Sequence, residues 1–161
     1  MTEPAVTNTS PLIVLTRIGY EHLLLAEGDR VIVPRAVADE VQVFGPDDPT
    51  VRALATHEWL RIIDTGPIQL QISDRGLGAG ESAVLTWALA HPGTDAILDD
   101  DEARRFGRVI GVPVIGTLGL ILRAKQLGAI PSARRVIAEA RGAGLYLSDA
   151  VVDAALVRVR E

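Results

Sequence analysis

The chain has 161 residues, of which 48% are hydrophobic and 23% are charged, and these proportions predict one compact domain covering residues 1–161. The apolar content excludes a disordered or fibrous chain, and the absence of cysteine excludes disulfides and thiolate zinc sites. The net charge of −5 is unevenly distributed: residues 1–100 carry 15 acidic and 6 basic side chains, whereas residues 101–161 carry 6 acidic and 10 basic.

Apolar runs of strand length alternate along the chain with segments that repeat at the helical period. This alternation predicts an α/β protein with a central, mainly parallel twisted sheet between layers of helices, a three-layer α/β/α fold. In the first part of the chain we expect a strand at residues 5–8, helices at 11–19 and 21–27, a strand at 30–33, a helix at 34–43, and then a short helix followed by a strand at 60–63. After residue 80 we expect a helix at 81–91, a strand at 95–98, a helix at 101–110 and a strand at 113–115. The rest of the chain is expected to be helical, at 118–127, 132–141 and 149–158.

Residues 64–80 carry the weakest pattern. Ile68, Leu70 and Ile72 alternate with two glutamines, which indicates an edge strand or, equally, a loop. We find no internal repeat, no low-complexity tract and no interdomain linker anywhere in the sequence.

Neither a membrane span nor a secretion signal is expected. The longest uncharged stretch, residues 109–122, is interrupted by Pro113 and by glycines, and it is too short to cross a bilayer. The first ten residues lack the basic and apolar regions of a secretion signal. Together with the absence of cysteine, this predicts a cytoplasmic protein with no membrane partner.

Two glutamates fall within the apolar stripes of predicted helices. Glu81 shares a helix face with Val84 and Leu85, and Glu40 lies in the apolar stripe of its own helix. Both carboxylates are therefore expected on inward faces, where an unpaired charge is expensive. Each carboxylate needs a partner, and a bound cation could serve both. Alternatively, Glu81 interacts with the N-terminus of its own helix and Glu40 pairs with an arginine.

Further oxygen-bearing side chains follow the predicted strands. Asn8 closes the first strand, and Asp99 and Asp100 follow the fourth. Because functional groups collect at the carboxyl ends of strands in an open parallel sheet, we expect these three residues to meet Glu40 and Glu81 at one spot. Carboxylates about 5 Å apart repel by roughly 3 kcal/mol at an effective dielectric of about 20, so the cluster stays fully ionised only around a cation. All-oxygen ligation favours Mg²⁺ or Mn²⁺ over zinc.

Other motifs are weaker. The glycines at 76, 78 and 80 do not complete a dinucleotide or P-loop signature, because Glu81 follows them. The three histidines show no metal-ligand spacing, and no serine stands in a nucleophile elbow. Asp99 and Asp101 form a D-x-D at a strand end, as in haloacid-dehalogenase-type phosphotransferases, which we keep as a minor alternative.

Five short blocks occur in the order found in one branch of the PIN-domain superfamily, whose members are known mostly as predicted nucleic-acid-binding proteins. N-T-S-P-L-I at residues 8–13 resembles its [D/N]-x-S-P-L-I opening. The other similar blocks are V-I-V-P at 31–34 followed by Glu40, G-E-S-A at 80–83, I-L-D-D at 97–100 with Ala103-Arg104, and G-T-L-G at 116–119 with Ala124-Lys125. The resemblance spans about residues 5–150, nearly the whole chain.

The resemblance implies a compact PIN fold and a Mg²⁺- or Mn²⁺-dependent phosphodiesterase site. The residues it assigns to catalysis and metal binding are Asn8, Glu40, Glu81 and Asp100, with Asp99 as neighbour or substitute and Ser10 supporting the first ligand by hydrogen bonding. An aspartate is usual in the superfamily where this chain has Asn8. The site therefore carries one negative charge fewer, and we expect weak activity.

The expected function is cleavage of single-stranded RNA by a metal-dependent endoribonuclease, which is also a candidate toxin of a toxin–antitoxin pair. The expected phosphate contacts are Arg104, Arg105, Arg108 and Lys125, in the basic second part of the chain. An antitoxin protein and a second copy of the chain, in a homodimer, are further expected partners. The alternative is a catalytically weak or inactive nucleic-acid-binding or regulatory module with the same fold.

Overall fold

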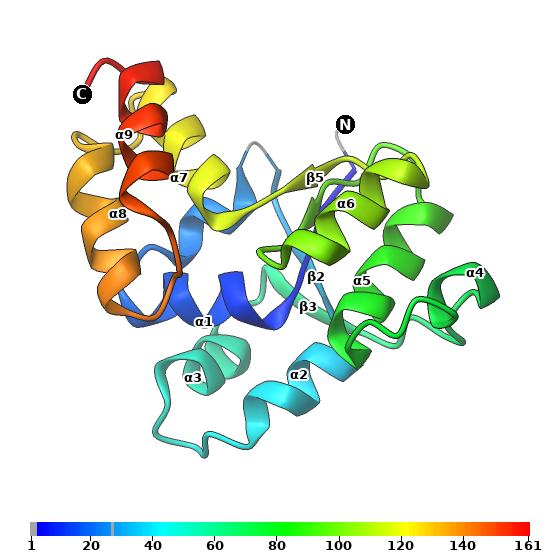
Figure 1. The fold of residues 1–161 in the computed structure, drawn as a ribbon. Helices are drawn as coiled ribbons and strands as arrows, with labels where there is room; N and C mark the ends of the chain where they lie inside the picture. Colours follow the sequence, from blue (N-terminus) through cyan, green and yellow to red (C-terminus); the bar gives the residue numbers. More distant parts are fainter. Residues whose placement is uncertain (1–2, 27) are drawn as a thin grey trace.

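The computed structural model describes residues 3–26 and 28–161, and its centre is a five-stranded, all-parallel sheet (Figure 1). The strands are β1 (Ala5–Thr7), β2 (Val31–Pro34), β3 (Leu60–Ile63), β4 (Ala96–Ile97) and β5 (Val114–Ile115), in the spatial order β3-β2-β1-β4-β5. β1 occupies the middle, because Val6 pairs with Ile32 on one side and with Ala96 on the other. The expected central parallel sheet is confirmed.

Helices cover both faces of this sheet. α5 (Ala79–Ala90) and α6 (Asp101–Val109) lie on one side, and α1 (Thr9–Arg17) and α7 (Thr117–Gln126) lie on the other (Figure 1). The remaining helical elements are η1 (Glu21–Leu25), α2 (Arg35–Gln42), α3 (Pro49–Thr56), α4 (Leu70–Ser73), α8 (Ala133–Gly142) and α9 (Asp149–Arg158). The three-layer α/β/α architecture is thereby confirmed. Within the part of the chain that the structure describes, no helix has the length and apolarity needed to cross a bilayer.

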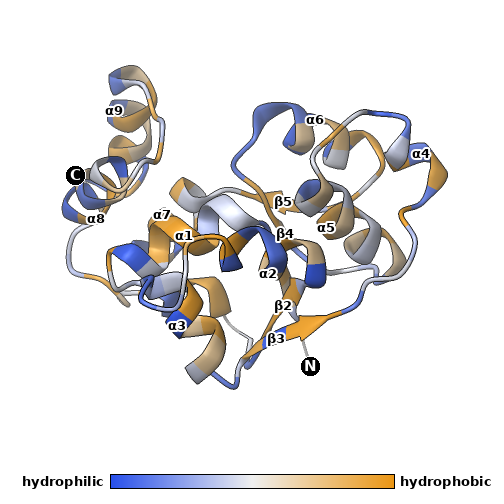
Figure 2. Cartoon of the chain, turned by 90° about the horizontal axis from the view of Figure 1, so that it is seen from below, coloured by the Kyte–Doolittle hydropathy of each residue, from blue (hydrophilic) through white to orange (hydrophobic). Residues whose placement is uncertain are grey.

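The central strands are buried because helices cover both faces, which is why they are continuous apolar runs in the sequence. Val6, Val31, Val33 and Ile97 are fully buried. Figure 2 shows hydrophobic residues along β2 and β3 and hydrophilic residues on the outer turns of α6 and α8. The core therefore lies on both sides of the sheet.

The edge strand considered for residues 64–80 is wrong, because this segment contains the short helix α4 instead. Of the three alternating apolar residues only Ile72 is fully buried, whereas Ile68 is half-buried and Leu70 is exposed. α4 packs against α5. The alternation in the sequence therefore did not correspond to one buried face.

Most predicted helix ends lie one or two residues from those in the structure, and two of these differences have a local cause. The first helix starts at Thr9 rather than at Pro11, with Asn8 at its N-cap position. A proline in the first turn is tolerated because the N–H groups there have no intrahelical acceptor. The helix predicted at residues 21–27 is the 3₁₀ helix η1, which Ala26 ends with a φ of 49°; the last residue of that prediction lies outside the described residues.

The C-terminal helices α8 and α9 extend the side of the molecule formed by α7 (Figure 1). α8 packs on α7, and α9 packs on α8. Glu161 accepts hydrogen bonds from the Ser132 hydroxyl (2.8 Å) and from the Ala133 N–H (2.6 Å) at the start of α8. It also pairs with Lys125 of α7 at 3.7 Å. The end of α9 is therefore tied both to α8 and to α7.

We expect Gly107→Ala to destabilise the fold. Gly107 is buried in α6, and an added β-carbon would lie 2.7 Å from Val114 Cγ1 and 3.2 Å from Leu85 Cδ2. Overpacking of this kind costs about 1–3 kcal/mol and outweighs the gain of roughly 1 kcal/mol from replacing a helical glycine by alanine. Urea denaturation of the wild type and the variant measures the difference in the free energy of unfolding.

Gly142→Ala, in α8, is the matched control. A β-carbon there meets no atom within 4 Å, so the variant should be neutral or slightly more stable than the wild type. If both variants lost the same free energy of unfolding, close packing of α6 against β5 and α5 would not be the reason.

Candidate active site

The candidate site lies at the carboxyl edge of the sheet, where β1 and β4 end side by side. The chain adds β2 and β3 on one side of β1 and later adds β4 and β5 on the other. Such a switch point is where open α/β sheets bind ligands. The Asn8 N–H donates to the Ile97 carbonyl at 3.0 Å, so Asn8 lies beside the end of β4, where Asp99 and Asp100 follow.

Asn8, Glu40 and Gly80 lie against one another in the site. The Asn8 side chain is buried, and its Oδ1 has no hydrogen-bond partner among the described residues. Glu40 Oε1 accepts a hydrogen bond from the Gly80 N–H at 3.1 Å, and Oε2 accepts one from the Thr9 hydroxyl. A β-carbon at position 80 would lie 2.7 Å from Asn8 Oδ1 and 3.0 Å from Glu40 Oε1. A larger residue would therefore displace the Asn8 amide or the Glu40 carboxylate, and glycine lets the first turn of α5 approach both without such a shift.

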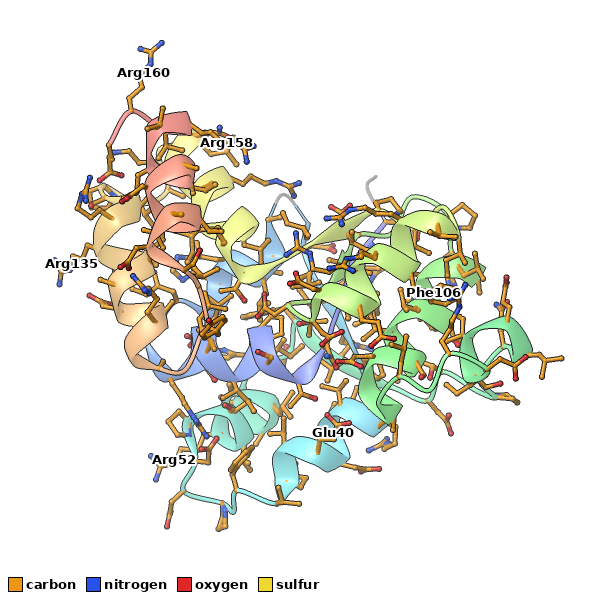
Figure 3. The ribbon with its side chains drawn as sticks, viewed as in Figure 1. Glu40, Arg52, Phe106, Arg135, Arg158 and Arg160 are labelled. Carbon is orange, nitrogen blue, oxygen red and sulfur yellow. The ribbon has the colours of Figure 1, made fainter. Side chains whose placement is uncertain are left out.

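Glu40 lies at the rim of the site and not on an inward face, so that prediction is wrong. Val37, Ala38 and Val41 form the buried side of α2, and Glu40 flanks it as an exposed residue. Its carboxylate reaches α1 and the start of α5, and Figure 3 shows it where α2 approaches α5. Among the described residues Glu40 has no ion pair with arginine or lysine, so the ion-pair alternative is also wrong.

Glu81, in the first turn of α5, is half-buried and accepts a hydrogen bond from the Gly78 N–H at 3.1 Å. Burial is the largest cause that raises the pKa of this carboxyl, and the negative charges of Asp100, Glu40 and Glu102 raise it further. The bond from Gly78 opposes the rise. Glu81 therefore contacts the helix N-terminus, as the alternative predicts, and it also belongs to the acidic group.

Asp99 and Asp100 hold the starts of two helices. Asp99 accepts hydrogen bonds from the N–H and the hydroxyl of Thr117, both at 2.7 Å, at the start of α7. Asp100 accepts one from the Ala103 N–H at 2.8 Å and so caps α6. Ser10, which the resemblance places in support of the first ligand, donates instead to Asp99 at 3.3 Å.

Four carboxylates in this group thus accept a hydrogen bond from backbone N–H groups at helix starts. Glu40 and Glu81 use the start of α5, Asp99 uses α7 and Asp100 uses α6. A helix N-terminus presents N–H groups without intrahelical acceptors and carries a positive partial charge. The acidic group is therefore partly compensated by three helices rather than by basic side chains.

The donor atoms suit a hard divalent cation by their chemistry, though not by their present spacing. They are all oxygens, the ligands that Mg²⁺ and Mn²⁺ prefer. A buried polar atom ordinarily has a hydrogen-bond partner, so the unpartnered Oδ1 of Asn8 beside Glu40 is in the condition expected of a ligand atom. Within residues 3–26 and 28–161, no three Asp, Glu, His or Cys side chains lie close enough together to hold an ion.

A groove of about 1110 Å³ opens from the acidic group and continues along α7. Its acidic end is lined by Asn8, Ser10, Glu81, Asp99, Asp100 and Asp101. Arg104 reaches the same place, next to Gly116. A β-carbon on Gly116 would lie 3.3 Å from Arg104 Nη1 and 3.1 Å from Asp99 Oδ1. The buried Nε of Arg104 has no hydrogen-bond partner in the described part of the chain. This arginine therefore faces the candidate site.

The other predicted phosphate contacts lie elsewhere. Arg105 and Arg108 are exposed and do not line the groove, because Phe106 and Gly107 are the residues that α6 turns to the core. The Lys125 ammonium donates to the Pro131 carbonyl at 2.6 Å and pairs with the C-terminal residue, near the far end of α7. Of the four predicted basic residues, the structure brings only Arg104 to the acidic group.

The sequence analysis missed three groups in the site. The hydroxyls of Thr9 and Thr117 hold Glu40 and Asp99, and Gly80 provides the close approach of α5. All three lie inside the blocks that carry the family resemblance. That placement was the available signal, but the polar partners of a carboxylate depend on contacts between segments far apart in the chain.

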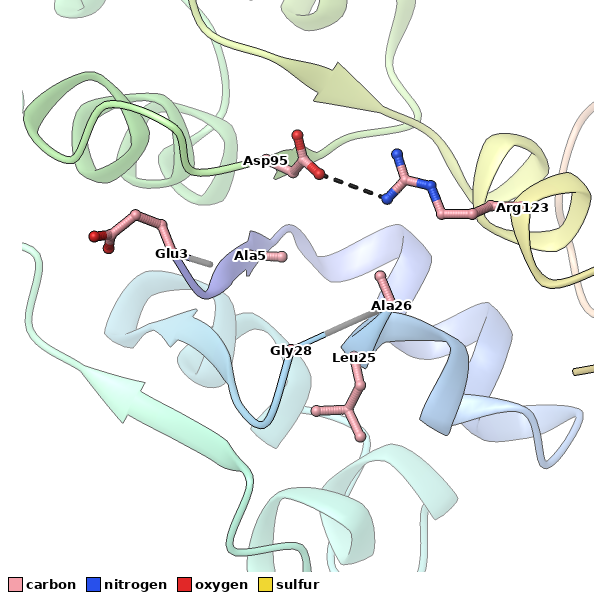
Figure 4. Close-up of a pocket in the computed structure, with 7 residues that line it drawn as sticks. All are labelled: Glu3, Ala5, Leu25, Ala26, Gly28, Asp95 and Arg123. Atoms are coloured by element: carbon pink, nitrogen blue, oxygen red, sulfur yellow. Dashed lines mark ion pairs between the residues drawn. The ribbon is translucent and has the colours of Figure 1, made fainter. Parts of the chain in front are cut away.

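A second cavity, of about 380 Å³, lies at the opposite, amino edge of the sheet (Figure 4). Ala5 at the start of β1 and Asp95 just before β4 line it. Arg123 of α7 pairs with Asp95 there at 3.6 Å. None of the predicted site residues lines this cavity.

Comparison with known proteins identifies one family. A family model described as a PIN domain, DUF3368, matches residues 4–161. No curated protein and no solved structure matches the chain.

We expect Glu81→Gln to raise the melting temperature of the metal-free protein at neutral pH by about 1–2 °C, a small effect because solvent screens a half-exposed charge. The raised pKa makes ionised Glu81 less favourable in the folded chain than in the unfolded one. At low pH both states are protonated, so the advantage of the variant appears only as the pH rises above the ordinary pKa of glutamate. Glutamine keeps an oxygen acceptor for Gly78.

Melting curves in EDTA across a pH series measure this difference. A variant that melts below the wild type at every pH would show that ionised Glu81 stabilises the fold as a cap.

Proposed function

Because the chain belongs to the PIN-domain family whose model covers residues 4–161, we propose that it is a metal-dependent endoribonuclease that hydrolyses phosphodiester bonds in single-stranded RNA. PIN domains form a nuclease-type superfamily that binds nucleic acid and typically uses divalent metals. The observation that carries the proposal is the buried, unpartnered Oδ1 of Asn8 beside the Glu40 carboxylate, at the switch point of the sheet.

The metal-holding residues in this proposal are Asn8, Glu40, Glu81 and Asp100, with Asp99 as their neighbour. When bound there, Mg²⁺ or Mn²⁺ would lower the pKa of a water molecule and neutralise charge on the phosphate. Arg104 faces the same spot and supplies a fixed positive charge for the phosphate oxygens. Asp99, held by Thr117 and Ser10, keeps the end of β4 in place.

A catalytically weak nucleic-acid-binding module is the second candidate. Asn8 supplies no negative charge, and the carboxylates of Glu81 and Asp100 already accept backbone hydrogen bonds. An antitoxin partner and a homodimer stay predictions. The haloacid-dehalogenase alternative is set aside, because the chain belongs to the PIN family and Asp101 is an exposed residue in the first turn of α6.

We expect wild-type protein to cleave labelled single-stranded RNA in Mn²⁺ and to lose this activity in EDTA. Glu40→Gln should reduce the cleavage rate by at least about 100-fold. Loss of a residue that only hydrogen-bonds to a metal ligand already costs up to about 100-fold, and a ligand itself should matter more. Asp39→Asn is the matched control, since it removes the same charge from the adjacent exposed residue, which makes none of the hydrogen bonds that tie Glu40 to Thr9 and Gly80. Gel analysis of the cleavage products gives the rates.

Equal losses in the Glu40 and Asp39 variants would indicate a general charge effect and contradict the assigned role of Glu40. Cleavage that persists in EDTA would contradict the metal requirement. RNA binding by the wild type without any cleavage would favour the binding module over the nuclease.

Arg104→Ala is expected to weaken RNA binding and to reduce the slope of log affinity against log salt by about 0.7, the value for one phosphate contact on a single strand. Arg108→Ala, one turn further along α6 and outside the groove, should change the slope much less. Filter binding across a salt series measures both variants. Equal salt slopes for Arg104→Ala and Arg108→Ala would contradict the phosphate contact assigned to Arg104.

A further inference from the structure

The groove extends well beyond the acidic group. α7 begins beside Asp99, which accepts a hydrogen bond from the Thr117 N–H. Near the other end of α7, Arg123 pairs with Asp95, which precedes β4 at the amino edge of the sheet. Arg123 and Gln126 line the groove together with the acidic residues. The groove therefore follows α7 for most of its length, which is about 15 Å for a ten-residue helix.

The far wall of the groove comes from the connection between α8 and α9. Leu145 is buried and its N–H donates to the Ala140 carbonyl at 3.0 Å, while Ser148 caps α9 by accepting from the Val151 N–H at 3.2 Å. Between these two anchors Tyr146 is 92% exposed and lines the groove. The connection is thus fixed on both sides of an aromatic ring that packs against almost nothing in the chain itself.

Arginines accompany this ring. Arg104 lies at the acidic end, and Arg123 and Arg158 line the groove further along. Arg158, at the end of α9, has no ion-pair partner among the described residues, whereas Arg123 forms an ion pair with Asp95. Figure 3 shows Arg158 on the side of α9 that faces α7 and Arg160 projecting away from the molecule.

We propose that this groove binds the RNA strand on one side of the phosphodiester to be cleaved, with one unpaired base stacked on Tyr146 and a backbone phosphate held by Arg158. The proposal rests on the proposed function: the groove is continuous with the acidic group, so an RNA cleaved at that group would also lie in the groove. Aromatic rings stack on bases of single strands, and arginines follow the phosphates. Bases inside a duplex are already stacked on their neighbours, so the site selects single-stranded RNA.

The experiment measures the affinity for a short labelled single-stranded RNA by fluorescence anisotropy in EDTA, where metal-dependent cleavage is off. Tyr146→Ala should weaken this binding by about tenfold, the effect typical of one stacked base, and Tyr146→Trp should retain it. Phe44→Ala is the matched control, because Phe44 is an exposed aromatic residue outside the groove, packed against Arg17. Binding to a blunt RNA duplex should be equal in the wild type and in Tyr146→Ala.

Arg158 has its own matched control in Arg160, an exposed arginine two residues further along and outside the groove. Arg158→Ala should lower the salt slope of single-strand binding by about 0.7, and Arg160→Ala should leave it unchanged. In Mn²⁺, Tyr146→Ala should raise KM for RNA cleavage and leave kcat near that of the wild type.

The outcomes separate this inference from the proposed function. If the wild type does not cleave RNA but its single-strand binding depends on Tyr146, the nuclease proposal fails and the groove stands. If the wild type cleaves RNA but Tyr146→Ala and Phe44→Ala bind it equally well, the groove fails and the nuclease stands. A Tyr146 variant that changes only self-association in sedimentation, with unchanged RNA binding, would make this surface a protein interface and overturn the proposal.

Discussion

The candidate site depends on the parallel pairing of β1 with β4. Thr7 and Ile97 are partners in this ladder, and the next N–H, that of Asn8, continues it by donating to the Ile97 carbonyl. The pairing brings together two strand ends that lie far apart in the sequence. α1, α6 and α7 begin where β1, β4 and β5 end, so helix starts and polar side chains gather at one edge.

Helix starts offset part of the negative charge at that edge. The carboxylates of Glu40, Glu81, Asp99 and Asp100 accept N–H groups from the starts of α5, α6 and α7. Partial charges at helix N-termini are fixed by the backbone and stabilise nearby anions. The chain can therefore fold with several carboxylates at one edge, while burial and mutual repulsion still raise the pKa of Glu81.

The C-terminal helices turn this edge into one end of a longer surface. Glu161 ties α9 to the start of α8 and to Lys125 of α7, and the connection before α9 carries Tyr146 into the groove wall. The acidic end and the arginine-bearing far end thus belong to one groove, whereas the cavity around Asp95 at the amino edge is separate from the acidic group. Lys125, the single lysine, is used to hold the fold together.

The sequence by itself determined the alternation of strands and helices, the parallel sheet, and the gathering of Asn8, Asp99 and Asp100 at one edge. These follow from local hydrophobic periodicity and from the rule that parallel strands end at the same side. Only the tertiary structure decided that Glu40 lies at the rim and that Arg104 alone of the predicted basic residues faces the acidic group. It also decided that residues 64–80 contain a helix. Those outcomes depend on how each helix is rotated and packed against distant segments, which local patterns do not encode.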